Sequence, residues 1–106
     1  MRFVNHNQLT TSWAQQFAMD NVQSLLVSLI NICNAAGSKV NVWVAVVQPG
    51  QAPVETDAIL WSFGINTDDK VEFFVGGIIG PSEQVWAKCD TNGVITMRVS
   101  GDIGGG

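Results

Sequence analysis

The stretch Val40–Val47 (VNVWVAVV) constrains the fold of this chain more than any other segment. Valine recurs at every second position from Val40 to Val46, and β-branched side chains at a period of two favour an extended strand. The opposite face carries Asn41, Trp43, Ala45 and Val47, so it is mostly apolar as well. A strand with two apolar faces is typical of the centre of a sheet, or of a strand that a second chain covers.

The composition indicates surface that faces a partner. Only 13% of the 106 residues are charged, against about 25% in an average soluble domain. A small domain has much surface to cover, so a shortage of charge predicts exposed apolar area and a homo-oligomer, for which we expect a trimer.

The net charge of −4 argues against a nucleic-acid partner, which a basic face would bind. The length predicts a single domain that folds without metal or disulfide support.

Short apolar-alternating segments follow the valine strand at intervals of about ten residues. Ile59, Trp61, Phe63 and Ile65 share one face of the first of them, which predicts a half-buried strand over 57–65. Further strands are expected over 70–75, over 84–89 with Val85, Ala87 and Cys89 inward, and over 94–100 with Ile95, Met97 and Val99 inward. Asn92-Gly93 predicts a hairpin between the last two. This pattern predicts an all-β, antiparallel β-sandwich that is jelly-roll-like, over residues 13–101.

The segment Val22–Cys33 (VQSLLVSLINIC) fits a helix and a strand equally well. Its apolar residues follow helical spacing, with Asp20 or Asn21 as a cap and Gly37 as a stop. As a strand, it would place its serines on the face opposite Cys33. In that case the short turn at 34–38 predicts a hairpin with the valine strand.

The two ends of the chain are expected to lie outside the domain. Residues 1–12 (MRFVNHNQLTTS) have weak periodicity and predict an extended N-terminal arm that drapes over a neighbour through Phe3, Val4 and Leu9. The glycine-rich residues 102–106 predict a flexible tail.

No catalytic, cofactor or metal constellation is recognisable. The one histidine, His6, lies in the expected arm, and Cys33 and Cys89 lack zinc-ligand spacing, so we expect two free, buried thiols. The acidic residues near 55–57 and 68–69 do not follow a calcium-loop pattern, and Gly76–Gly80 lacks the lysine of a phosphate loop. We therefore expect neither an enzyme nor a cofactor.

Neither a signal peptide nor a membrane-length apolar run is present, which predicts a reducing compartment and no membrane partner.

Four tryptophans and no tyrosine make up an unusual aromatic set. On the face assignments above, Trp43 and Trp86 point outward. Such residues serve more often as a core or a subunit interface than as a sugar- or peptide-binding groove, although the groove stays open as an alternative.

Several motifs, in this order, resemble a family of small tailed-bacteriophage structural proteins of roughly a hundred residues. They are Cys33-Asn34 before a short turn, the valine-rich strand, Ile79-Gly80-Pro81 before Val85-Trp86, and the final strand over 94–101. The resemblance covers residues 22–101 and implies a non-enzymatic, often oligomeric β-sandwich, with 22–33 as a strand. Members often have a Pro-Ala-Gly turn where this chain has Ala18-Met19-Asp20-Asn21, so the N-terminal part departs from the pattern.

Composition and resemblance together lead to the hypothesis of a capsid decoration (cement) protein. It would be assembled in the host cytoplasm, reside in the virion and bind the major capsid protein or other virion proteins. The contact residues we expect are Phe3, Val4 and Leu9 of the arm, and Trp43 or Trp86. The alternatives are a tail or tail-fibre adaptor, a receptor-binding module, and a carbohydrate-binding β-sandwich.

Overall fold

The computed structural model describes residues 2–55, 58–73 and 78–105, and in them the chain forms nine strands and no helix. The all-β prediction is therefore confirmed, and the ambiguous segment is a strand. The strands are β1 (Arg2–Gln8), β2 (Ala14–Ala18), β3 (Gln23–Asn34), β4 (Val40–Val47), β5 (Ala58–Ile65), β6 (Lys70–Phe73), β7 (Ile78–Ile79), β8 (Gln84–Cys89) and β9 (Ile95–Gly105).

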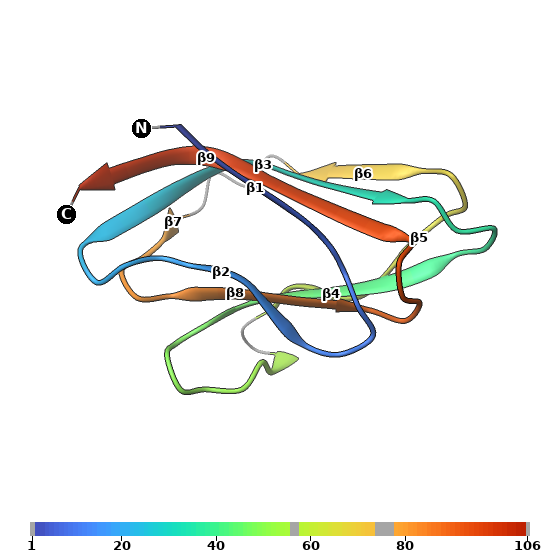
Figure 1. Ribbon diagram of the computed structural model, residues 1–106, viewed down its shortest axis with the longest axis horizontal. Helices are drawn as coiled ribbons and strands as arrows, with labels where there is room; N and C mark the ends of the chain where they lie inside the picture. Colours follow the sequence, from blue (N-terminus) through green and yellow to red (C-terminus); the bar gives the residue numbers. More distant parts are fainter. Residues whose placement is uncertain (1, 56–57, 74–77, 106) are drawn as a thin grey trace.

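The strands form two antiparallel sheets that pack face to face (Figure 1). One sheet has the order β1-β9-β3-β6, and β7 pairs with β3 on the same side as β6. The other sheet has the order β2-β8-β4-β5. Because β6 and β7 pair with different parts of β3, they act as two pieces of one strand. The chain then passes repeatedly between the sheets, which is the connectivity of a jelly roll.

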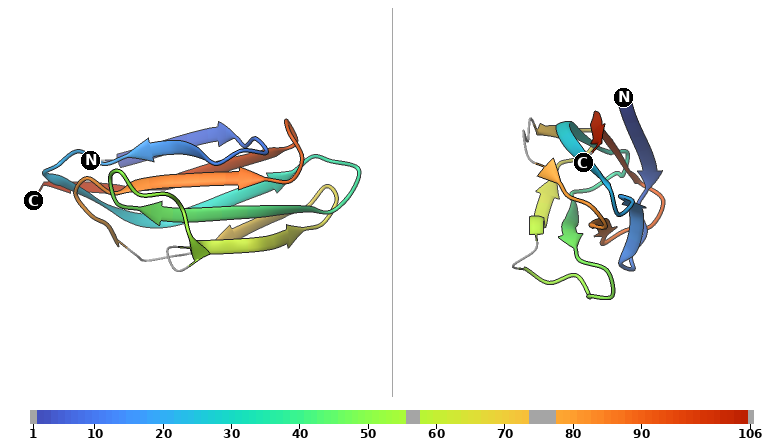
Figure 2. Two further views of the ribbon diagram at one scale, coloured as in Figure 1. Left: turned by 90° about the horizontal axis from the view of Figure 1, so that it is seen from below. Right: turned by 90° about the vertical axis from the view of Figure 1, so that its left-hand side faces the viewer.

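The longer strands run roughly along the long axis of the sandwich, which measures 43 × 27 × 20 Å (Figure 2). The long strands β3 and β9 set this length, since an antiparallel strand rises about 3.4 Å per residue. The core lies between the sheets. Val40, Val42 and Val44 of β4 are fully buried there. The inward faces predicted for β8 and β9 are confirmed, because their alternate residues are at most 2% exposed.

The tight turns connect the two sheets instead of forming hairpins. β3 and β4 lie in different sheets, and so do β8 and β9, so both predicted hairpins are wrong. The strand β3 already pairs with β9 on one side and with β6 and β7 on the other, which leaves no edge for β4. Asn34 holds this corner: its Nδ2 donates to the carbonyls of Ser38, Ile65 and Asn66 at 2.9–3.2 Å, and its Oδ1 accepts from the N–H of Ala36.

The predicted N-terminal arm and C-terminal tail are parts of the sheet. Every residue of β1, from Arg2 to Gln8, pairs with β9, and Leu9 is fully buried in the core. Alternate β1 residues face inward, and the centroid of the Phe3 ring lies 4.9 Å from that of Phe17. This segment therefore buries apolar area within its own chain and does not need a neighbouring subunit to do so. Residues 102–105 belong to β9 and pair with β3 as far as Gln23. Glycine supplies few side-chain contacts, but it does not prevent backbone pairing.

Bulges overturn two face assignments that strict alternation predicted. In β3, Ser28 is an extra residue opposite Gly101, so the inward positions shift from Val27 to Ile30 and Cys33 points outward. In β5, two bulges interrupt the pairing with β4, and Ser62 has a φ of 54°. As a result Leu60 and Ile65 are buried, whereas Trp61 and Phe63 are 40% and 38% exposed. The predicted inward face of β5 is therefore wrong at Trp61 and Phe63, whereas Ile65 is buried and Ile59 packs against the core.

The bulge at Ser28 requires glycine on the facing strand, because a Cβ atom at Gly101 would overlap the carbonyl oxygen of Leu26. We expect Gly101→Ala to lower the free energy of unfolding by about 1–3 kcal/mol, the usual cost of overpacking. The matched control is Gly104→Ala on the same strand, where an added Cβ meets nothing within 4 Å. Urea unfolding monitored by tryptophan fluorescence measures both, and equal midpoints would contradict this account of the bulge.

Candidate functional site

All four tryptophans gather on the outer face of the β2-β8-β4-β5 sheet. Trp43 and Trp86 alternate with buried residues of β4 and β8, so both predicted outward positions lie on this face. The bulge in β5 turns Trp61 outward, and Trp13 directly precedes β2. Together with Lys88, these four residues are called the tryptophan face below.

Trp13, Trp61, Trp43 and Lys88 of the tryptophan face are connected by contacts across the width of the sheet. β2 and β5 are opposite edge strands, yet the Trp13 and Trp61 rings are only 6.0 Å apart between centroids. The two side chains therefore reach over the two central strands, where Lys88 and Trp43 are directly paired. The Lys88 Nζ lies 4.7 Å from the Trp43 ring centroid and 5.3 Å from that of Trp13. Such cation–π contacts are worth about 0.5–1 kcal/mol each at exposed sites.

The second apolar face of β4 lies on the same side of the sheet as the tryptophan face. Ala45 pairs with Trp86, on the outward side of the sheet, but it is 0% exposed, and so is Val47. The protein's own chain therefore covers part of the second apolar face. Trp61 remains 40% exposed, so the outer layer of the cluster is in contact with solvent.

The edges of the sheet that carries the tryptophan face are poorly suited to strand addition. The edge strands β2 and β5 both contain register shifts, at Gln16 and around Trp61. The side-chain amides of Asn5 and Asn7 reach from β1 toward the carbonyl of Gln16, at 3.5 and 3.3 Å. Bulged and capped edges disfavour pairing with another chain. A partner is therefore more readily bound on a face than along an edge.

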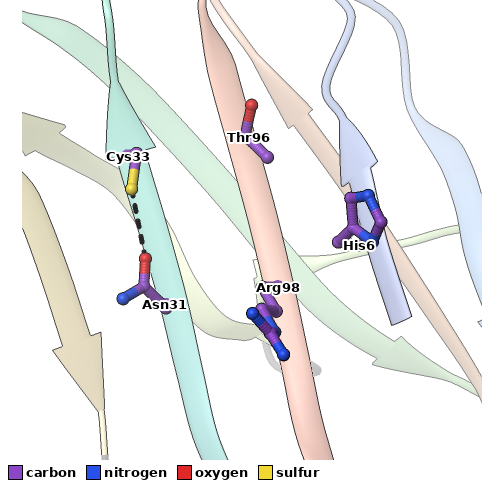
Figure 3. Close-up of a pocket in the computed structure, with 5 residues that line it drawn as sticks. All are labelled: His6, Asn31, Cys33, Thr96 and Arg98. Atoms are coloured by element: carbon purple, nitrogen blue, oxygen red, sulfur yellow. Dashed lines mark hydrogen bonds between the residues drawn. The ribbon is translucent and has the colours of Figure 1, made fainter. Parts of the chain in front are cut away.

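The outer face of the other sheet contains a shallow groove of about 340 Å³. Its lining residues, called the polar groove below, come from β1, β9 and β3 and are His6, Asn31, Cys33, Thr96 and Arg98 (Figure 3). His6 pairs with Arg98, and Arg98 pairs with Asn31 in the next strand. The Cys33 Sγ contacts the Asn31 Oδ1 at 3.2 Å. β9 separates Cys33 from His6, so the two do not form a nucleophile–base pair.

The three residues of the expected arm do not form one surface. Leu9 is 0% exposed, so it cannot contact a partner of the folded chain. Phe3 packs on the core beside Phe17, and only Val4, at 42% exposure, faces solvent.

No His, Cys, Asp or Glu cluster able to hold a metal ion occurs in the described ranges. Asp57, Gly76 and Gly77, considered above, lie outside those ranges. None of the described segments is a helix long and apolar enough to cross a membrane.

Sequence reasoning missed Trp13, Trp61 and Lys88 as parts of the site. The outward position of Trp61 depends on the β5 bulge, and glycine or proline does not mark this bulge in the sequence. Trp13 reaches its neighbours across the sheet, from outside any regular strand. The one available signal was the number of tryptophans.

No protein-family model, curated protein or solved structure matches this chain. Its function must therefore be argued from the two outer faces themselves.

The contact between the Trp13 and Trp61 rings can be tested optically. Trp13 and Trp61 are close enough for their indole transitions to couple, so we expect an exciton couplet in far-ultraviolet circular dichroism. Trp61→Phe should abolish the couplet, whereas Trp86→Phe, elsewhere on the same face, should leave it intact. A couplet that survives Trp61→Phe would contradict the contact across the sheet.

The two thiols are free, as expected, but they differ in environment. Cys33 is exposed, whereas Cys89 is buried, its Sγ lies 3.0 Å from the Thr91 carbonyl, and burial raises its pKa. Thiol reagents react with the thiolate form of an accessible cysteine. A thiol reagent should therefore label only Cys33 in the native chain and both cysteines after unfolding in denaturant. Rapid native labelling of Cys33→Ser would contradict the burial of Cys89.

Proposed function

We propose that this chain is a non-enzymatic structural protein of a tailed-phage virion, and specifically a capsid decoration protein that attaches through its tryptophan face. The observation that carries the proposal is the cluster of four tryptophans on one outer face of a small domain with few charges. Tryptophan is enriched among the residues that dominate the binding energy of protein interfaces.

The geometry of the cluster suits attachment to a broad protein surface. The Trp13 ring already contacts that of Trp61, and Lys88 contacts Trp13 and Trp43, so these side chains lose less conformational freedom on binding, which lowers the entropic cost of association. Burial of apolar area contributes roughly 25 cal/mol per Å². Across the many copies bound to one shell, even a modest gain per copy would stabilise the capsid.

The virion part of the proposal is supported by the sequence motifs at Cys33-Asn34, Val40–Val47 and residues 94–101, and by an architecture that viral capsid domains also use. Because the jelly roll also occurs in lectins, the fold alone does not decide between a virion protein and a carbohydrate-binding protein. We propose a trimer as the attached form. The bulged edges of β2 and β5 favour an assembly through faces over one through edge pairing.

Two other functions fit the same face. A tail or tail-fibre adaptor, or a receptor-binding module, would use it in another part of the particle. A carbohydrate-binding module is favoured by one specific observation, the indole cluster beside polar residues such as Gln84, whose Oε1 accepts from the Trp86 Nε1 at 2.9 Å. A panel of sugars that leaves tryptophan fluorescence unchanged would remove that candidate.

The decisive test measures rebinding of the purified chain to empty capsids of the phage that encodes it. We expect Trp61→Ala to weaken binding by about 30-fold, which corresponds to the loss of roughly 2 kcal/mol at an interface hot spot. The matched control is Ile78→Ala, which truncates a 70% exposed apolar residue on the other sheet and should change affinity by less than about twofold.

Three results would contradict the proposal: absence of the chain from purified virions, equal binding of both variants, or sedimentation of the wild-type chain with tails alone. The last result would favour the adaptor function.

A further inference from the structure

We propose that the polar groove binds a single carboxylate group, presented by an acidic side chain of a protein partner and held by Arg98. The groove lies on the sheet opposite the tryptophan face, so this inference does not rest on the proposed function.

Arg98 is a cation without a partner. In residues 2–55, 58–73 and 78–105, the one ion pair joins Lys70 to Glu72 at 3.1 Å, and Arg98 takes part in none. Glu72 is engaged by its neighbours, since its Oε1 also accepts from the Asn31 Nδ2 at 3.0 Å. The hydrogen bond and the charge of Glu72 raise the pKa of Lys70. Arg98 is therefore left with the planar donor fork that pairs bidentately with carboxylates.

The neighbours of Arg98 on this face include further side chains that can donate hydrogen bonds. His6 pairs directly with Arg98 on β1, and Thr96 lies on the same face of β9, two residues before Arg98. Figure 3 shows His6 on one side of β9 and Asn31 with Cys33 on the other, with Thr96 and Arg98 between them. None of the five lining residues carries a negative charge. The groove thus combines a guanidinium, an imidazole and a hydroxyl, and no lining acid competes for them.

The charge balance favours one carboxylate over a polyanion. Nucleic acids bind through several lysines and arginines that neutralise successive phosphates, whereas this groove has one permanently charged residue. The chain carries a net charge of −4, which repels polyanions at long range. A volume of about 340 Å³ lies at the lower end of the usual range for ligand pockets, roughly 300–1,000 Å³. Because Arg98 and His6 are exposed, a side chain on a partner surface can reach them.

The test is a titration of the full chain followed by NMR. The probe is a capped pentapeptide with one central glutamate, and the same peptide with glutamine is the control ligand. We expect the glutamate peptide to shift the signals of His6, Thr96 and Arg98, and the glutamine peptide to leave them unchanged. Arg98→Gln should weaken glutamate-peptide binding about tenfold or more, because hydrogen bonds to charged groups contribute about 1.5–3 kcal/mol.

Arg2→Gln is the matched variant, since Arg2 is exposed on the same sheet, lies opposite Asp102 in the strand register and is outside the groove. It should leave the affinity within about twofold. Equal shifts with both peptides, or equal losses in both variants, would overturn the proposal. Inorganic phosphate serves as a further ligand, and tighter binding of phosphate than of the glutamate peptide would also overturn it. A retained amide spectrum confirms that Arg98→Gln folds.

Discussion

The absence of a polar face on β4 is the constraint on which the rest of the structure depends. One row of its side chains, including Val42 and Val44, fills the centre of the core. The other row includes Ala45 and Val47, which are also fully buried although they lie on the outward side of the sheet. Burial of both rows requires a central position between β8 and β5 and an apolar cover over the outer face. Trp43 and Trp86 lie on that same side of the sheet, so the candidate site is built on the second apolar face of β4.

The strands could be predicted from residue patterns because alternation with a period of two reflects burial directly. This worked for β4, β8 and β9, where the pairing of β4 with β8 and of β9 with β1 is regular. It failed at Cys33 and Trp61, because a bulge adds one residue and exchanges the inward and outward positions beyond it. It failed again at the turns, where Asn92-Gly93 marked a reversal of the chain but not the sheet that the next strand joins.

The ends of the chain show a second limit of local reasoning. Residues 2–8 have too few apolar side chains to predict a core strand, yet all of them pair with β9. Their place in the sheet depends on β9, about ninety residues later in the chain, so no local window contains the cause. The same holds for the candidate site: Trp43 and Trp86 could be predicted from their own strands, whereas the contact between Trp13 and Trp61 depends on the order of all four strands.

The two outer faces of the sandwich differ in chemistry, and we infer that they serve different contacts. The tryptophan face presents connected rings around one lysine, whereas the polar groove presents an unpaired guanidinium beside an imidazole. The central claim is that the tryptophan face attaches the chain to its partner. Oxidative footprinting of the free and the capsid-bound chain tests it most directly. The account predicts that Trp61 is protected from oxidation in the bound state, and unchanged oxidation of Trp61 with protection of His6 instead would contradict it.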